Sequence, residues 1–278
     1  MKTFFKWQGN KSKHFKYIVP ELPSQYNTYI EPFIGSGALF LHIKPKKWMI
    51  NDLNQDNISI WELAKNEPQY IKTEFLKFKR HFLKRTNKDK LIYCRKKTNE
   101  LNDMVKSNQR TILYMLMTYC AYLGNILIYK KFNFKGIEMN IYINNRCFFL
   151  EPSYFTNLFA VSNFLNSKKG KIYNDDYKKI LKKAKEGDFV FLDPPYIEDH
   201  NYGFKYNKGE KLDSKFMSEL KQQCDLLDKK KVKWLMTQAD TKQVRDTFKD
   251  YTIKEYPVYR RGNNSYKNEL LIKNYGES

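Results

Sequence analysis

The N-terminal part of the chain reads as strand, turn, helix and strand, and this order constrains the fold more than any other feature. Residues 28–31 are rich in β-forming side chains, a glycine-containing turn occupies residues 32–37, and residues 38–41 open a short helix. Residues 48–52 form a second short apolar strand that ends in a carboxylate. Such a beginning is typical of a doubly wound sheet, in which helices connect parallel strands. It predicts an α/β fold.

Further strand-forming segments come late in the chain, at residues 171–173, 189–193, 233–237 and 269–272. Pro152 and Ser153 form a plausible N-cap for a helix that runs to about residue 166. Residues 58–147, between the two strand-rich parts, are patterned as helices. The simplest architecture is one α/β domain built from residues 1–57 and 148–278, interrupted by a mostly helical insertion at residues 58–147.

The chain carries 51 Lys and Arg residues against 30 Asp and Glu residues, a formal net charge of +21 at pH 7. A surface this basic repels itself unless it meets a polyanion, so nucleic acid is the first candidate partner and an anionic membrane the second. The insertion contributes strongly, because residues 77–97 include ten Lys or Arg residues and a single acid, Asp89.

Cysteine and histidine spacing argues against several kinds of site. The four cysteines form no C-x-x-C pair, so neither a zinc knuckle nor a thioredoxin-type site is encoded. The four histidines form no H-x-x-x-H pair, which argues against a zinc hydrolase. The N-terminus has no secretory signal, and unpaired thiols suit a reducing compartment. We expect a cytoplasmic protein that uses no metal.

One uncharged segment, residues 112–129, is about long enough for a membrane-spanning helix. Its tyrosines and the Gly124-Asn125 break dilute the apolar character, and basic residues flank both sides. A buried helix and turn in a soluble domain is the preferred interpretation, with a membrane helix as the alternative.

The strongest chemical indication is Asp193-Pro194-Pro195-Tyr196, directly after the apolar run at residues 189–192. The two prolines fix φ and offer no backbone donors, which makes a rigid, acceptor-rich lip at the carboxyl end of a strand. Ligands of α/β sheets bind at that edge. An amine could donate there to the Asp193 carboxylate and the Pro194 carbonyl, while Tyr196 stacks on its ring.

The turn after the first strand contains Phe33, Gly35 and Gly37. Glycines let the backbone approach a ligand closely, and amides at a helix N-terminus can face an anionic group. Asp52 closes the next strand, roughly the ~20 residues downstream at which an acid binds ribose hydroxyls in nucleotide folds. Alone, each feature is equally compatible with an ordinary turn.

Six motifs together resemble the Dam-type, alpha-group family of S-adenosylmethionine-dependent DNA adenine-N6 methyltransferases. They span nearly the whole chain: Phe5-Lys6-Trp7-Gln8-Gly9-Asn10-Lys11, residues 31–37, Asn51-Asp52, Asp175-Asp176-Tyr177, Asp193-Pro194-Pro195-Tyr196, and residues 269–272 with Asn274-Tyr275. The resemblance implies a Rossmann-like methyltransferase fold, with residues 58–147 as the target-recognition insertion.

The resemblance also implies a role for each matched residue. Trp7 and Lys11 would close over S-adenosylmethionine, and Asp52 would hold its ribose. Phe33, Gly35 and Gly37 would form the cofactor loop, and Asp176 with Tyr177 would border the cofactor adenine. Asp193, Pro194 and Tyr196 would be catalytic, with Asp193 also beside the cofactor. The substrate would be an adenine flipped out of double-stranded DNA.

Three alternatives keep the fold: an RNA adenine as substrate, a protein glutamine amide as substrate, or a catalytically silent DNA-binding subunit. Glutamine methyltransferases usually have N-P-P-Y, so Asp193 argues against the second. Intact Trp7, Lys11, Asp52 and Asp193 argue against the silent subunit. Residues 118–125 lack the Arg and Asn residues with which family members read G-A-T-C, so another short site is at least as plausible. A separately acting restriction endonuclease is a candidate partner. The expected oligomeric state is a monomer. If the protein is viral, it would work in the host cytoplasm or nucleus.

Overall fold

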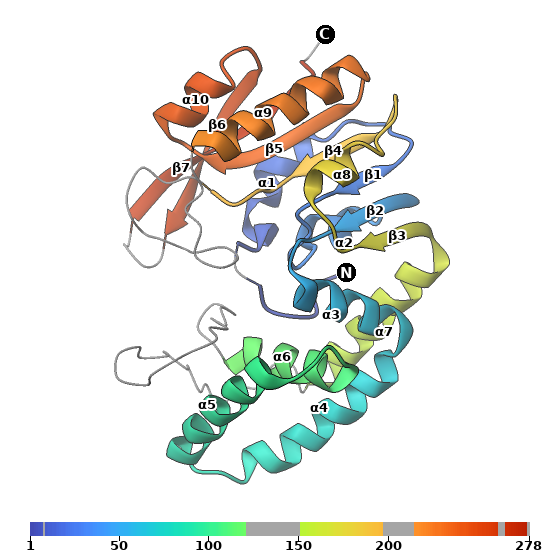
Figure 1. Cartoon of the computed structure of the whole chain (residues 1–278), viewed down its shortest axis with the longest axis vertical. Helices are drawn as coiled ribbons and strands as arrows, with labels where there is room; N and C mark the ends of the chain where they lie inside the picture. The colour runs from blue at the N-terminus through green and yellow to red at the C-terminus, as the bar shows by residue number, and fades with distance from the viewer. Residues whose placement is uncertain (8, 121–150, 197–213, 261–264, 277–278) are drawn as a thin grey trace. The chain divides into compact units, whose positions relative to one another are not determined.

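Seven strands form one mixed sheet in the computed structural model, which describes residues 1–7, 9–120, 151–196, 214–260 and 265–276 (Figure 1). The strands are β1 (Tyr29–Glu31), β2 (Lys47–Asn51), β3 (Lys169–Tyr173), β4 (Phe189–Leu192), β5 (Lys233–Ala239), β6 (Thr252–Arg260) and β7 (Ser265–Lys273). Their order is β3-β2-β1-β4-β5-β7-β6. The first five are parallel, and β7 runs antiparallel to both neighbours. The predicted α/β fold is confirmed.

The strand order reverses between β1 and β4. From β1 the chain continues to β2 and β3 on one side, and it then returns to β4 and β5 on the other. Loops that leave two adjacent parallel strands in opposite directions leave room for a ligand at their carboxyl ends. Residues 32–34, 52–54, 174–176 and 193–196 all follow parallel strands and therefore lie along this edge.

Contacts within the chain define two units. The sheet unit comprises Lys11–Ile34, Pro45–Asn54 and Lys169–Ser278, and the helical unit comprises Met1–Asn10, Gly35–Lys44 and Gln55–Lys168.

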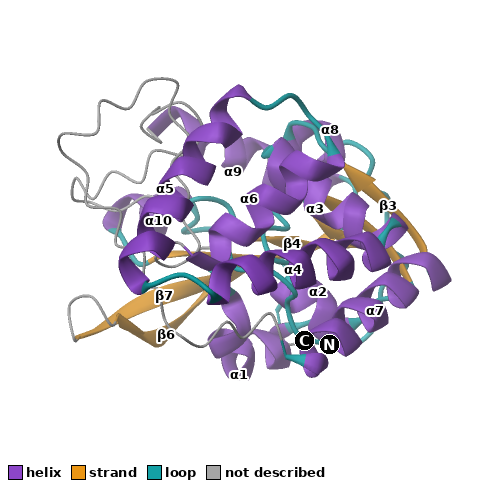
Figure 2. Ribbon diagram, turned by 90° about the horizontal axis from the view of Figure 1, so that it is seen from below, coloured by secondary structure: helices purple, strands orange, loops and turns teal. Residues whose placement is uncertain are grey.

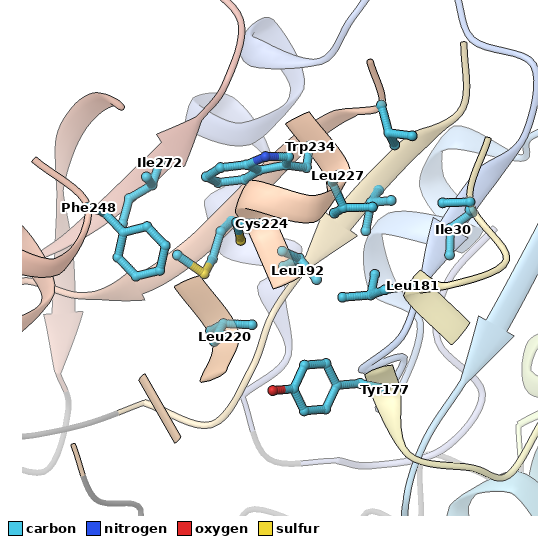
Figure 3. Close-up of a cluster of buried hydrophobic side chains, with 14 of the residues drawn as sticks. Ile30, Tyr177, Leu181, Leu192, Leu220, Cys224, Leu227, Trp234, Phe248 and Ile272 are labelled. Atoms are coloured by element: carbon cyan, nitrogen blue, oxygen red, sulfur yellow. The ribbon is translucent and has the colours of Figure 1, made fainter. Parts of the chain in front are cut away.

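Short helices and one long helix cover the sheet. They are η1 (Lys11–His14), α1 (Phe15–Ile18), η2 (Val19–Glu21), α8 (Tyr177–Leu181), α9 (Ser214–Lys229) and α10 (Lys242–Thr247). Figure 2 shows α8 and α9 on one side of the sheet and α1 on the other. Figure 3 shows the core beneath α9, where Leu220, Cys224 and Leu227 meet Leu192 and Trp234. All four residues of β4 are buried, as expected for a central parallel strand.

The helical unit contains α2 (Ala38–Ile43), α3 (Gln55–Asn66), α4 (Pro68–Leu83), α5 (Asn87–Asp103), α6 (Asn108–Cys120) and α7 (Pro152–Ser167). Trp61 of α3 is fully buried and packs edge-on against Phe4, Phe5 and Phe40. The hydroxyls of Tyr119 and Tyr154 both donate to the Phe4 carbonyl, which fixes the N-terminal segment to α6 and α7.

One local prediction was wrong, and one strand was not predicted. Pro152 is the first residue of α7, and Glu151 is the N-cap residue without a side-chain cap; proline suits the first helical position because it lacks an N–H that would be unsatisfied there. The unpredicted strand is β6, which contains Pro257. β6 is an edge strand, where a proline is tolerated.

Of the uncharged segment 112–129, residues 112–120 belong to α6, where Met115 and Met117 are buried, and residues 121–129 lie outside the described residues. Among the helices that the structure describes, none is long and apolar enough to cross a membrane.

Gly170 of β3 faces Trp48 of β2, and an added Cβ atom would lie 1.9 Å from Cε2 of that buried ring. We expect Gly170→Ala to lower the free energy of unfolding by about 1–3 kcal/mol through overpacking. The measurement is urea unfolding. The control is Lys171→Ala, on the exposed face of the same strand, whose free energy of unfolding should stay within about 0.5 kcal/mol of wild type. Equal unfolding midpoints for both variants would contradict this packing.

Candidate active site

The Asp193 carboxylate follows β4 and is held through one of its oxygens. Nζ of Lys11 lies 2.8 Å from Oδ1, and the Thr237 hydroxyl on β5 donates to the same atom over 2.7 Å. Among the residues that the structure describes, none donates to Oδ2. The Lys11 side chain is 9% exposed and that of Asp193 is 18% exposed. Little water therefore screens the ion pair, and the second oxygen keeps its acceptor capacity.

The remainder of the Asp193-Pro194-Pro195-Tyr196 segment is fixed by the strands beside it. Nε2 of buried Gln238 donates to the Pro195 carbonyl over 3.3 Å, and the Tyr196 hydroxyl donates to Oε2 of Glu269 over 2.9 Å. Nζ of Lys11 lies 4.7 Å from the centroid of the Tyr196 ring. The site thus includes residues that sequence reasoning did not single out. Polar side chains at 237 and 238 within an apolar strand were the available signal.

Asn51 joins three loops at the carboxyl edge of the sheet. Its side chain donates to the carbonyls of Pro32 and Asp175 and accepts from the Asp175 amide. Its own carbonyl accepts from the Ile34 amide. Asp52 comes directly after β2, and its Oδ1 accepts from the Asn54 amide over 2.9 Å. These bonds fix the loop after β1 and the loop after β3 around Asp52.

Phe33 and Tyr177 lie side by side, with ring centroids 5.1 Å apart. Tyr177 is buried in the core under α9, whereas Phe33 is half-buried. Asp176 caps α8, since its Oδ1 accepts from the Lys178 amide over 2.8 Å. The predicted residues Phe33, Asp52, Asp176 and Asp193 all follow parallel strands of the sheet unit.

Trp7, Gly35 and Gly37 belong to the helical unit. Gly35 and Gly37 have φ values of 47° and 62°, in the left-handed region that favours glycine. An added Cβ atom at Gly35 would lie 2.8 Å from Cδ1 of Trp7. The Gly35 carbonyl accepts from Asn57 and from Trp61, both on α3. Trp7 therefore rests on a backbone position that only glycine fills without strain.

Glu31, at the end of β1, is a buried carboxyl group close to Asp193. The Tyr29 hydroxyl donates to it over 2.7 Å. Burial raises the pKa of Glu31 well above its ordinary value, and the charges of Asp193 and Asp52 raise it further, while the Tyr29 hydrogen bond and Lys11 oppose them. Glu31 thus holds its proton to higher pH than an exposed glutamate.

In the described part of the chain, no three or more His, Cys, Asp or Glu side chains lie together as a metal site would require.

Comparison with known proteins identifies the chemistry. The model of the D12 class N6 adenine-specific DNA methyltransferases matches residues 7–260. The chain belongs to this family. It is thus an enzyme that methylates adenine in DNA, and the reaction requires a methyl donor. The family and the fold implied by the sequence motifs are confirmed.

Several curated relatives carry names of the same kind. The chain is 26% identical to the type II methyltransferase M1.LlaDCHI of Lactococcus lactis subsp. cremoris, over 99% of this chain and 96% of the relative. It is 22% identical to a DNA adenine methylase of Haemophilus influenzae, over 98% and 91% of the two chains. It is 27% identical to the type II methyltransferase M.MjaIII of Methanocaldococcus jannaschii, over 70% and 69%.

The proton held by Glu31 predicts a pH dependence. Above about pH 4.5, the ordinary value, the unfolded Glu31 ionises while the folded one stays protonated, so stability from this group falls as pH rises. Glu31→Gln cannot ionise and escapes this loss. Its melting temperature relative to wild type should therefore rise between about pH 5 and about pH 8.

The matched control is Glu21→Gln. Lys254 and Lys273 lower the pKa of Glu21 by hydrogen bonds. The stabilisation of the folded state by ionised Glu21 is therefore fully present at any pH above the pKa of Glu21 in the unfolded chain. Its difference from wild type should stay constant over the same interval. A constant difference for Glu31→Gln as well would rule out the protonated carboxyl group.

Proposed function

We propose that the chain transfers a methyl group from S-adenosylmethionine to the N6 amine of an adenine flipped out of double-stranded DNA. The observation that carries this proposal is the Asp193 carboxylate: Lys11 and Thr237 bind Oδ1, and Oδ2 accepts from none of the described residues. The carboxylate lies at the edge where the strand order reverses, which is where ligands of such sheets bind.

The adenine amine is a poor nucleophile, because its lone pair is delocalised into the ring. Hydrogen bonds from its two N–H groups to Oδ2 of Asp193 and the carbonyl of Pro194 favour the geometry in which the lone pair is freed. Asp193 positions the amine and is the nearest acceptor for the surplus proton. S-adenosylmethionine supplies an electrophilic methyl group on a sulfonium.

Tyr196 stacks on the flipped base. Flipping costs a few kcal/mol, and stacking on an aromatic ring recovers roughly 1–3 kcal/mol. The Lys11 ammonium lies over one face of the Tyr196 ring, 4.7 Å from its centroid, and we place the base on the other face.

Residues of the sheet unit fit the cofactor. Asp52 offers a carboxylate for the ribose hydroxyls, and the half-buried Phe33 beside Tyr177 offers an aromatic surface for the adenine, with Asp176 at its border. In the helical unit, the close approach of Trp7 to Gly35 supports a role for Trp7 in closing over the cofactor beside Gly35 and Gly37 of the cofactor loop.

The insertion at residues 58–147 serves target recognition, with its basic helices α4 and α5 on the DNA backbone. Part of it, residues 121–147, lies outside the described residues, as do most of the positions that depart from the G-A-T-C-reading pattern. The names of relatives as type II methyltransferases support a separately acting restriction endonuclease as partner. The enzyme works as a monomer where DNA is available, in the cytoplasm or, if viral, in the host cytoplasm or nucleus.

Asp193→Ala should lower methylation by about a hundredfold or more while the affinity for DNA stays within about twofold, because the carboxylate acts on the amine and not on the backbone. Activity is measured with tritiated S-adenosylmethionine and binding by fluorescence anisotropy. Asp246→Ala, an exposed carboxylate on α10, is the control with wild-type activity. An equal loss of affinity and activity in Asp193→Ala would show that Asp193 binds DNA instead.

Exposed cations of the insertion should set the salt dependence of DNA binding. Replacing Arg80, Lys84 and Lys96 by Gln should reduce the slope of log K against log salt by about 0.9 for each phosphate that the variant no longer neutralises. The control variant replaces Lys182, Lys185 and Lys229 by Gln. These exposed lysines lie near the amino ends of β4 and β5, away from the carboxyl ends of the strands, so the variant loses the same charge at a different place. Equal slopes for both triple variants would show that α4 and α5 do not bind phosphates.

A further inference from the structure

Three donors converge on Oε2 of Glu269, a buried carboxylate on β7 that takes no part in the proposed methyl transfer. The Tyr196 hydroxyl lies 2.9 Å from this atom, the Tyr256 hydroxyl 3.0 Å, and Nδ1 of His14 3.4 Å. Glu269 is only 4% exposed. The donors come from β6, from η1 and from the segment after β4. One carboxylate therefore fixes Tyr196 to two other elements of the sheet unit.

The pKa values of the two groups determine that Tyr196 donates the hydrogen bond and Glu269 accepts it. Burial by itself would raise the pKa of Glu269, but the hydrogen bond from His14 and the charge of Lys11 lower it to about 2. Burial, with the nearby carboxylates of Asp193 and Glu269, raises the pKa of Tyr196 well above its usual value. At neutral pH Glu269 is an anion and Tyr196 a phenol that donates to it. Such charge-assisted bonds are about twice as strong as neutral ones.

The Tyr196 ring is constrained at both ends. Gln238 binds the carbonyl of the preceding Pro195, Glu269 binds the hydroxyl, and the Lys11 ammonium lies 4.7 Å from the ring centroid. A side chain already held in one orientation loses little rotamer freedom when a ligand stacks on it, which lowers the free-energy cost of ordering the complex.

We infer that Glu269 is a positioning residue for the target base: it sets the plane of the Tyr196 ring before the adenine arrives. The inference rests on the proposed function, in which Tyr196 stacks on the flipped adenine. Glu269 acts through the Tyr196 hydroxyl, and His14 and Tyr256 hold Glu269 in turn.

The test is a double-mutant cycle between Glu269→Gln and Tyr196→Phe, since each removes one partner of the same bond and keeps the side-chain shape. We expect each single variant to lower kcat about tenfold, and the double variant to be no slower than the slower single variant. The substrate is a duplex carrying the site that the wild-type enzyme methylates on plasmid DNA. A second duplex has 2-aminopurine at the target adenine, and its fluorescence should be less quenched with both single variants, because the base stacks less well on a loosened ring.

Two controls separate positioning from general stability. Glu21→Gln removes another largely buried carboxylate, one that binds Lys254 of β6 and Lys273 of β7, the same two strands. It should lower the melting temperature and leave kcat and fluorescence unchanged. Tyr256→Phe removes a different donor from Glu269 and should reduce kcat less than Tyr196→Phe does.

Two results would overturn the inference. One is a double variant whose loss of kcat equals the product of the two single losses, and the other is an unchanged kcat in Glu269→Gln. Should Glu269→Gln fail to fold, Tyr196→Phe decides alone, because unchanged kcat and quenching in that variant would equally overturn it. A failure of the proposed function is seen in the wild-type enzyme, as absence of N6-methyladenine or of any fluorescence change on binding the duplex.

Discussion

The Asp193 carboxylate is held on one side only, and the arrangement of the active site depends on that asymmetry. Lys11 approaches it from the N-terminal helix η1 and Thr237 from the neighbouring strand β5, and both bind Oδ1. This arrangement requires β4 to lie between β1 and β5, with its carboxyl end at the point where the strand order reverses. Removing an ion pair from water is costly, and here the Thr237 hydroxyl supplies the additional hydrogen bond that offsets part of the loss.

Two carboxyl groups near Lys11, Glu31 and Glu269, have pKa values shifted in opposite directions because their surroundings differ. Glu31 is buried with a single hydroxyl donor, so its pKa is raised, whereas Glu269 collects His14 and two tyrosines and its pKa falls to about 2. Asp193, between them in the sheet, is partly exposed and paired with Lys11. Groups of one chemical type thus differ at this edge of the sheet: Glu31 holds its proton to higher pH, Glu269 is a buried anion, and in the proposed mechanism Asp193 accepts from the substrate amine.

Much of the fold and part of the site were predictable from local sequence. Apolar runs ending in Asp52 and Asp193 marked β2 and β4, and the proline pair at 194 and 195 marked the edge where ligands bind. The roles of Thr237, Gln238 and Glu269 were not predictable, because they depend on the pairing of β5 with β4 and with β7, which is a tertiary property. Strand β6 was not predicted. It contains Pro257, which is tolerated because β6 is an edge strand, and the sequence does not specify which strand is the edge. The resemblance to adenine methyltransferases supplied Lys11 and Asp193 as separate residues, and only the structure joins them in an ion pair.

The most direct measurement is single-molecule sequencing of plasmid DNA from a methylation-free strain that expresses this protein, with N6-methyladenine read at each position. The account predicts N6-methyladenine at one short motif and at no other base, because in the proposed mechanism Asp193 and Pro194 accept from the exocyclic amine of a flipped adenine and Tyr196 stacks on its ring. Unmodified DNA would contradict it, provided that the protein recovered from the same cells is folded and melts at a higher temperature with S-adenosylmethionine.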